Sequence, residues 1–107
     1  MHSEIKVAIV TGAGTGIGRC TALSLLREGY SVVLGGRRKD QLNITVKEAG
    51  DRGSQTLVVP TDVADPASVQ NLFKQTKETF ERLDLLFNNA GIAGVESLIS
   101  SKRAGAI

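Results

Sequence analysis

The sequence contains a single cysteine, Cys20, which excludes an intramolecular disulfide and a metal site built from several cysteines. Apolar runs such as Val32–Leu34 are far shorter than the roughly 20 residues that a membrane span needs. The first six residues lack the layout of a secretory signal or a transit peptide. We therefore expect a cytoplasmic protein without a metal site and without membrane contact.

No charge of either sign dominates the 107 residues, because 13 Lys and Arg are balanced by 11 Asp and Glu to give a net charge of +2. The basic residues are scattered and form no stripe, so the sequence gives no reason to expect nucleic-acid binding. A charged fraction of 22% is ordinary for a folded domain, which argues against disorder driven by charge. The length is that of one domain.

Short apolar runs alternate with longer segments of helical spacing. The runs predict strands at 5–11, 31–35, 56–60 and 83–88, and the longer segments predict helices at 16–28, 38–49 and from Pro66 to Phe80. This alternation is typical of an α/β fold with a Rossmann-type parallel sheet and flanking helices, here truncated after the fourth strand. In the first helix, the buried face is expected to carry Ile17, Cys20, Leu23 and Leu26. Residues 1–91 are predicted to form a partial Rossmann-type domain, and residues 92–107 an irregular tail.

A glycine-rich loop, Thr11–Gly18, joins the first strand to the first helix. Glycines let a chain turn sharply and approach a ligand closely, while the free amides and positive end of the helix attract a pyrophosphate. The alternative is a tight turn that binds nothing. The candidate binding residues in this loop are Gly12, Gly14, Thr15, Gly16, Ile17 and Gly18.

The glycine spacing follows G-x-x-x-G-x-G through Gly12, Gly16 and Gly18, and Thr11 precedes it. With this pattern the chain resembles the short-chain dehydrogenase/reductase family, whose nucleotide loop is T-G-x-x-x-G-x-G. The segment Asn88–Gly91 is similar to the family's N-N-A-G motif, and Asp62-Val63 is similar to the acidic pair that lies beside the adenine ring. The resemblance covers residues 5–91 and implies a dinucleotide cofactor, with Asp62, Val63, Asn89, Ala90 and Gly91 among its contacts.

The second predicted strand ends in a basic turn that contains Arg37 and Arg38. A dinucleotide site reads the adenosine ribose about twenty residues beyond its glycine loop, where an acid favours NAD and an arginine favours the 2′-phosphate of NADP. A guanidinium can hold a phosphate through two parallel hydrogen bonds. These residues therefore predict NADP, with NAD less favoured, although a solvated basic turn would look the same.

The resemblance also implies a Tyr-x-x-x-Lys pair for proton transfer and an upstream serine, and this sequence offers neither. Tyr30 is the single tyrosine, and Leu34 follows it where a lysine would be needed. Serines at 97, 100 and 101 precede the expected position, and Lys102 has no tyrosine partner, so we assign no catalytic residue.

Two functions stay open for this chain. The first is an NADP(H)-dependent oxidoreductase represented by its cofactor-binding portion, which would meet a small-molecule substrate only in a full-length form. The second is a nucleotide-binding or regulatory fragment without turnover. The order 3-2-1-4 that the doubly wound pattern implies leaves the fourth strand at an edge, so self-association through that edge is expected.

Overall fold

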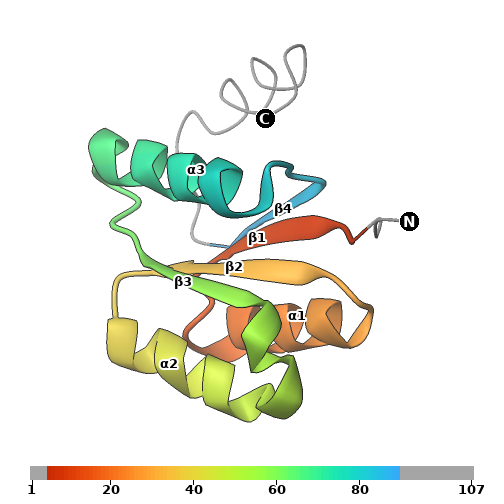
Figure 1. The fold of residues 1–107 in the computed structure, drawn as a ribbon. Helices are drawn as coiled ribbons and strands as arrows, with labels where there is room; N and C mark the ends of the chain where they lie inside the picture. The colour runs from red at the N-terminus through yellow and green to blue at the C-terminus, as the bar shows by residue number, and fades with distance from the viewer. Residues whose placement is uncertain (1–4, 90–107) are drawn as a thin grey trace.

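The computed structural model describes residues 5–89. Four parallel strands, β1 (Val7–Thr11), β2 (Ser31–Gly36), β3 (Thr56–Pro60) and β4 (Leu85–Asn88), form one sheet in the order β3-β2-β1-β4. The connections between them contain the helices α1 (Gly16–Arg27), α2 (Lys39–Glu48) and α3 (Pro66–Phe80). Figure 1 shows α1 and α2 on one face of the sheet and α3 on the other. The predicted fold class and strand order are thereby confirmed.

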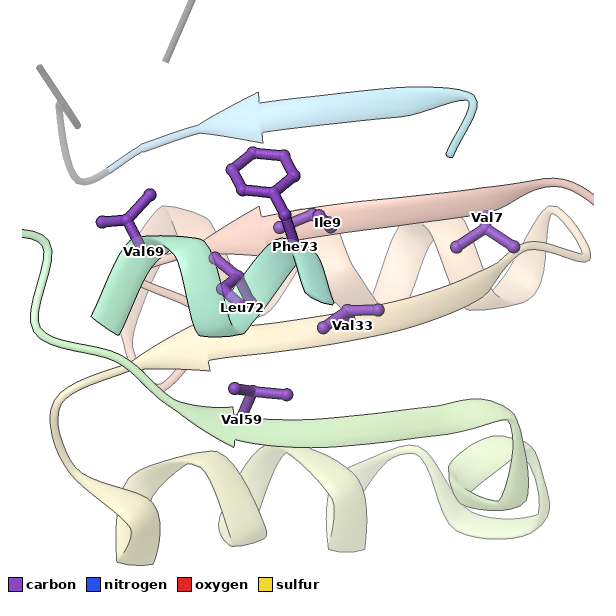
Figure 2. Packing of buried hydrophobic residues seen from close by; sticks show 7 residues of the cluster. All are labelled: Val7, Ile9, Val33, Val59, Val69, Leu72 and Phe73. Atoms are coloured by element: carbon purple, nitrogen blue, oxygen red, sulfur yellow. The ribbon is translucent and has the colours of Figure 1, made fainter. Parts of the chain in front are cut away.

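Two apolar clusters hold the helices against the sheet. Because successive strand side chains point to opposite faces, Val7 and Ile9 of β1 pack toward α3, whereas Val10 packs toward α1 and α2. Figure 2 shows the cluster beneath α3, whose buried members are Val7, Ile9, Val33, Val59, Val69, Leu72 and Phe73. The second cluster contains Val10, Ala13, Ala22, Leu26, Val32, Leu34 and Leu42. All five residues of β1 are buried, as expected for a strand covered on both faces.

The buried face of α1 differs from the prediction. Gly18, Ala22 and Leu26 are buried, whereas Ile17 is 69% exposed and Cys20 is also exposed. Gly18 lies directly against the carbonyl of Gly12, while Ala22 and Leu26 face the sheet and Leu23 packs partly buried against the same cluster. The prediction was therefore wrong for Ile17 and Cys20, whereas Leu26 is buried as predicted.

Several element boundaries also differ from the predicted ones. Strand β1 begins at Val7 and leaves Ile5 exposed, and α2 begins at Lys39 with Arg38 as its N-cap. A 3₁₀ helix, η1 (Gly50–Gln55), fills the connection between α2 and β3. The start of α3 follows the prediction, since Asp65 accepts a hydrogen bond from the amide of Ala67 at 3.0 Å and Pro66 occupies the first turn.

Asp84 fastens the beginning of β4 to the sheet. Its Oδ2 accepts hydrogen bonds from the Val7 amide and from Arg82 Nε, both at 2.8 Å, and its own amide donates to the Val7 carbonyl at 2.8 Å. Arg82 Nη2 donates to the other carboxylate oxygen at 2.7 Å, which completes a two-pronged pair. Strand β4 begins at Leu85, directly after these contacts and two residues later than predicted.

We predict that Asp84→Asn destabilises the fold by about 1 kcal/mol, since it weakens a charge-assisted pair that is partly exposed. The hydrogen bond from Arg82 lowers the pKa of the Asp84 carboxyl below its ordinary value of 3.8. A lowered pKa in the folded state means that this stabilisation is complete above pH 3.8 and disappears as the pH falls through the lowered pKa. Urea unfolding at pH 7 and in steps below pH 4 measures both effects.

The control variant is Asp51→Asn, which removes an exposed carboxylate from η1. Equal unfolding free energies for Asp84→Asn and the wild type at pH 7 would contradict the prediction.

Candidate cofactor-binding site

The strand register brings the predicted site residues to the carboxyl end of the sheet. Thr11 is paired with both Gly35 and Asn88, and Gly36 is paired with Pro60. All four strands are parallel, so the loops that follow them emerge together at their carboxyl ends, where open α/β sheets bind ligands. Tyr30 lies at the opposite end, immediately before β2 begins.

Close contacts within the protein fix the path of the glycine loop. Gly12 has φ +65°, and a Cβ added there would stand 2.8 Å from Nδ2 of Asn89. A Cβ at Gly18 would stand 1.9 Å from the Gly12 carbonyl oxygen, a distance that no side chain permits. Gly18 is therefore required by close approach inside the loop, and Gly12 by its positive φ, a conformation that side chains rarely adopt. Gly12 also brings the loop against Asn89, which joins the two motifs that were distant in the sequence.

The amino end of α1 also lies at the carboxyl end of the sheet. Thr15, Gly16 and Ile17 are exposed. The first hydrogen bond of the helix is the one that the Arg19 amide donates to the Thr15 carbonyl, at 3.2 Å. The initial amides of a helix have no acceptor within it and carry its positive dipole end. This arrangement can receive an anion such as a pyrophosphate.

The two arginines after β2 differ in their surroundings. Arg38 forms an exposed ion pair with Asp40, with 3.1 Å between Nη2 and Oδ2. The hydrogen bond from Arg38 lowers the pKa of the Asp40 carboxyl below its ordinary value. Arg37 is exposed and makes no ion pair within residues 5–89. Of the two predicted phosphate ligands, Arg37 is the one that could bind a phosphate without first breaking an ion pair to a residue in 5–89.

Asp62 and Val63 form the turn that follows β3. The Asp62 carboxylate accepts a hydrogen bond from the amide of Ala64 at 2.9 Å, and the Asp62 amide donates to Ser68 Oγ at 2.8 Å. Thr61 ties this turn to the neighbouring strand, because its amide donates to the Gly36 carbonyl at 2.7 Å. Val63 packs against the cluster beneath α3. The acidic pair is thus held in a fixed turn beside the end of β2.

Some predicted residues lie outside the described part of the chain. These are Ala90 and Gly91 of the N-N-A-G motif, the boundary at residue 91, and the whole of the predicted tail with its serines and Lys102.

Sequence reasoning missed three polar residues that support the loop, namely Arg19, Gln41 and Thr45. The Arg19 guanidinium donates to the Gly14 carbonyl and to Thr45 Oγ1, the latter at 3.0 Å. The one available signal was Thr45, a polar residue one turn after Leu42 on the apolar side of α2. Arg19 gave none, because a charged residue on a helix is usually solvated.

Within residues 5–89, no helix has the length and apolar character to cross a membrane. The same part of the chain contains no group of three or more His, Cys, Asp or Glu residues that could hold a metal ion.

Comparison with known proteins agrees with this geometry. The sequence pattern of the family described as short chain dehydrogenase matches residues 6–104, so the chain belongs to that family. An uncharacterized oxidoreductase of Staphylococcus aureus (strain MRSA252) is 45% identical over 98 residues. The match includes 91% of this chain and 39% of the relative, so the chain spans about two fifths of that relative's length.

Two solved structures share the fold. A short chain dehydrogenase/reductase from Burkholderia phymatum, in complex with NAD, is 36% identical with a TM-score of 0.72 over 77% of this chain and 29% of its own. An alcohol dehydrogenase from the archaeon Thermococcus sibiricus, complexed with 5-hydroxy-NADP, is also 36% identical with a TM-score of 0.72, over 78% of this chain and 36% of its own. Family membership thus supports a dinucleotide ligand and leaves the choice between NAD and NADP to the residues of this chain.

Proposed function

We propose that this chain binds NADP(H) in preference to NAD(H), as the cofactor-binding portion of an oxidoreductase that transfers hydride between the cofactor and an alcohol or carbonyl substrate. The observation that carries the proposal is that the glycine loop, Arg37, Asp62 and Asn89 all lie at the carboxyl end of the sheet. Membership of the short chain dehydrogenase family supports the reaction class.

The residues at this end of the sheet fit a dinucleotide. The amides at the start of α1 suit its pyrophosphate, and the exposed side chain of Ile17 gives an apolar surface next to them. Asp62 and Val63 border the place proposed for the adenine, and Asn89 borders the glycine loop from the other side. Bound nicotinamide supplies the hydride chemistry, and the contribution of this chain is to bind and orient it.

The preference for NADP(H) rests on Arg37. An exposed guanidinium without an ion pair in the described residues can meet a 2′-phosphate without first losing a partner. Arg38 can join it at little cost, because an exposed pair such as Arg38–Asp40 contributes little to stability. An NAD-binding site would instead need an acid that accepts hydrogen bonds from both ribose hydroxyls. No acid stands between the end of β2 and Asp40, which lies in the first turn of α2.

Arg37→Asp is expected to weaken NADPH binding roughly ten- to hundred-fold and to change NADH binding much less, since it replaces a phosphate ligand with a repelling charge. Titration of both cofactors, followed by NMR, measures the change. Lys74→Asp makes the same charge change on the exposed side of α3 and should leave both affinities unchanged. Equal affinities of the wild type for NADPH and NADH would rule out the NADP assignment.

The second candidate function is nucleotide binding without turnover. The observation that favours it is that the 107 residues contain no Tyr-x-x-x-Lys, and the single tyrosine stands at the opposite end of the sheet from the glycine loop. Proton transfer to or from the substrate oxygen needs a positioned acid or base. None of the described residues takes that role.

We expect no oxidation of NADPH and no reduction of NADP by this chain with a panel of alcohols and carbonyl compounds. Absorbance at the reduced-nicotinamide band follows the reaction in either direction. Turnover that is tied to one substrate and scales with protein concentration would show that a different residue serves as the acid or base, and would exclude this second function.

We also propose that β4 pairs with β4 of a second copy of this chain. Among the described residues β4 lies at an edge of the sheet and pairs with β1 alone. Its residue Leu85 is 38% exposed, and the strand Leu85–Asn88 contains neither a charge nor a proline, which natural edges use to prevent pairing. A self-complementary edge of this kind suits a two-fold dimer.

Light scattering after size-exclusion chromatography should therefore show a dimer that dissociates on dilution. Leu85→Lys places a charge on the edge and should favour the monomer. Ile44→Lys is the matched control, because Ile44 has a similar exposure of 40% and lies on α2, away from the edge. A monomer at all concentrations, or equal dissociation of both variants, would contradict the proposal.

A further inference from the structure

Arg19 connects three segments that meet behind the glycine loop. Its side chain is only 20% exposed although it lies on a surface helix. Nη2 donates to the Gly14 carbonyl and to the Gln41 carbonyl and Oε1, the last two at 3.3 and 3.2 Å. Nε donates to Thr45 Oγ1 at 3.0 Å, and Nη1 lies 3.7 Å from Glu48 Oε2. One guanidinium on α1 thus holds both the loop and α2.

Thr45 extends this network to the preceding residue of the loop. It is fully buried, and its hydroxyl donates to the Ala13 carbonyl at 2.8 Å while it accepts from Arg19. The Ala13 carbonyl thus points to Thr45 of α2, and the Gly14 carbonyl points to Arg19, which contacts the same helix. A buried hydroxyl with one donor and one acceptor partner leaves no polar group unsatisfied at this contact.

Gly14 is explained by the same contact. A Cβ at Gly14 would stand 2.8 Å from the Cβ of Gln41, so a side chain there would push α2 away from the loop. The glycine allows α2 to approach closely enough for Arg19 to reach Gln41 and Thr45. Gly14, which lies between the first two glycines of the motif, therefore serves this junction.

The direction of the carbonyls determines the direction of the amides that follow them. A peptide unit is planar and trans, so its C=O and N–H point in opposite directions. Because the Ala13 carbonyl points to Thr45 and the Gly14 carbonyl points to Arg19, the amides of Gly14 and Thr15 point away from these two side chains. These amides precede the start of α1 and add to its donors.

We propose that Arg19 is a positioning residue: through Gly14, Gln41 and Thr45 it fixes the peptide orientation that turns the Gly14 and Thr15 amides toward a pyrophosphate. The identity of that ligand rests on the proposed function, whereas the peptide orientation does not. Arg19 itself does not contact the cofactor in this proposal, since its donors are directed at the loop carbonyl and at α2.

The first test needs no ligand. In Arg19→Met, the Gly14 and Thr15 amide signals in a ¹⁵N-resolved NMR spectrum of the chain should broaden or double, because the released peptides sample a second orientation. Arg27→Met is the matched control: it removes an α1 arginine whose side chain, among residues 5–89, bonds only to the exposed Ser24. Unchanged Gly14 and Thr15 signals in Arg19→Met would overturn the proposal.

The second test separates positioning from a general loss of structure. Arg19→Met should weaken NADPH binding about tenfold, a change well above the error of a titration, and leave 2′-AMP binding within about twofold, because 2′-AMP carries the phosphate assigned to Arg37 and no pyrophosphate. Arg19→Lys should fall between Met and the wild type, since an ammonium can reach one carbonyl but cannot span Gly14, Gln41 and Thr45 together. If Arg19→Met does not fold, the lysine variant decides by the same comparison.

The outcomes distinguish the two proposals. Equal NADPH affinities for wild type, Arg19→Met and Arg19→Lys would overturn the positioning role while leaving the proposed function intact. A wild type that binds no NADPH, together with altered Gly14 and Thr15 signals in Arg19→Met, would refute the proposed function and support the control of the loop by Arg19.

Discussion

The parallel pairing of β1 on both of its sides is the constraint on which the rest of the structure depends. Its five residues are buried, and its register with β2 and β4 sets where the loops of all three strands begin. Thr11 is the last residue of this strand, so the glycine loop starts at a point fixed from two sides. A shift by one residue would turn each β1 side chain to the opposite face and exchange the members of the two cores.

Support on the two faces of the sheet is unequal. Two helices cover one face and α3 covers the other, so Leu72 and Phe73 contribute much of the packing there. Strand β4 joins this arrangement through β1 and through the contact between Asp84 and Val7. Burial of aliphatic side chains is the main favourable contribution on both faces, while a few polar contacts determine where each element begins.

The sequence allowed the strands, their order and the motif loops to be predicted, because each follows from a local pattern or from the family resemblance. The face of α1 could not be predicted, since the contact between Gly18 and the Gly12 carbonyl depends on the tertiary path of the loop. The role of Arg19 was hidden for a related reason. Its partners Gln41 and Thr45 lie more than twenty residues away, and no spacing rule connects them. The spacing of apolar residues describes one helix at a time, whereas the contacts of Arg19 join α1 to α2.

Helix α2 has a consequence for how two phosphates would be recognised together. Its first turn follows Arg37 and Arg38, and the side chain of Gln41 in the same turn lies against Gly14. The 2′-phosphate and pyrophosphate positions proposed above therefore share one rigid support. A ligand that carries both groups meets the second position at a high effective concentration once the first is occupied, so its affinity exceeds what either phosphate alone would give.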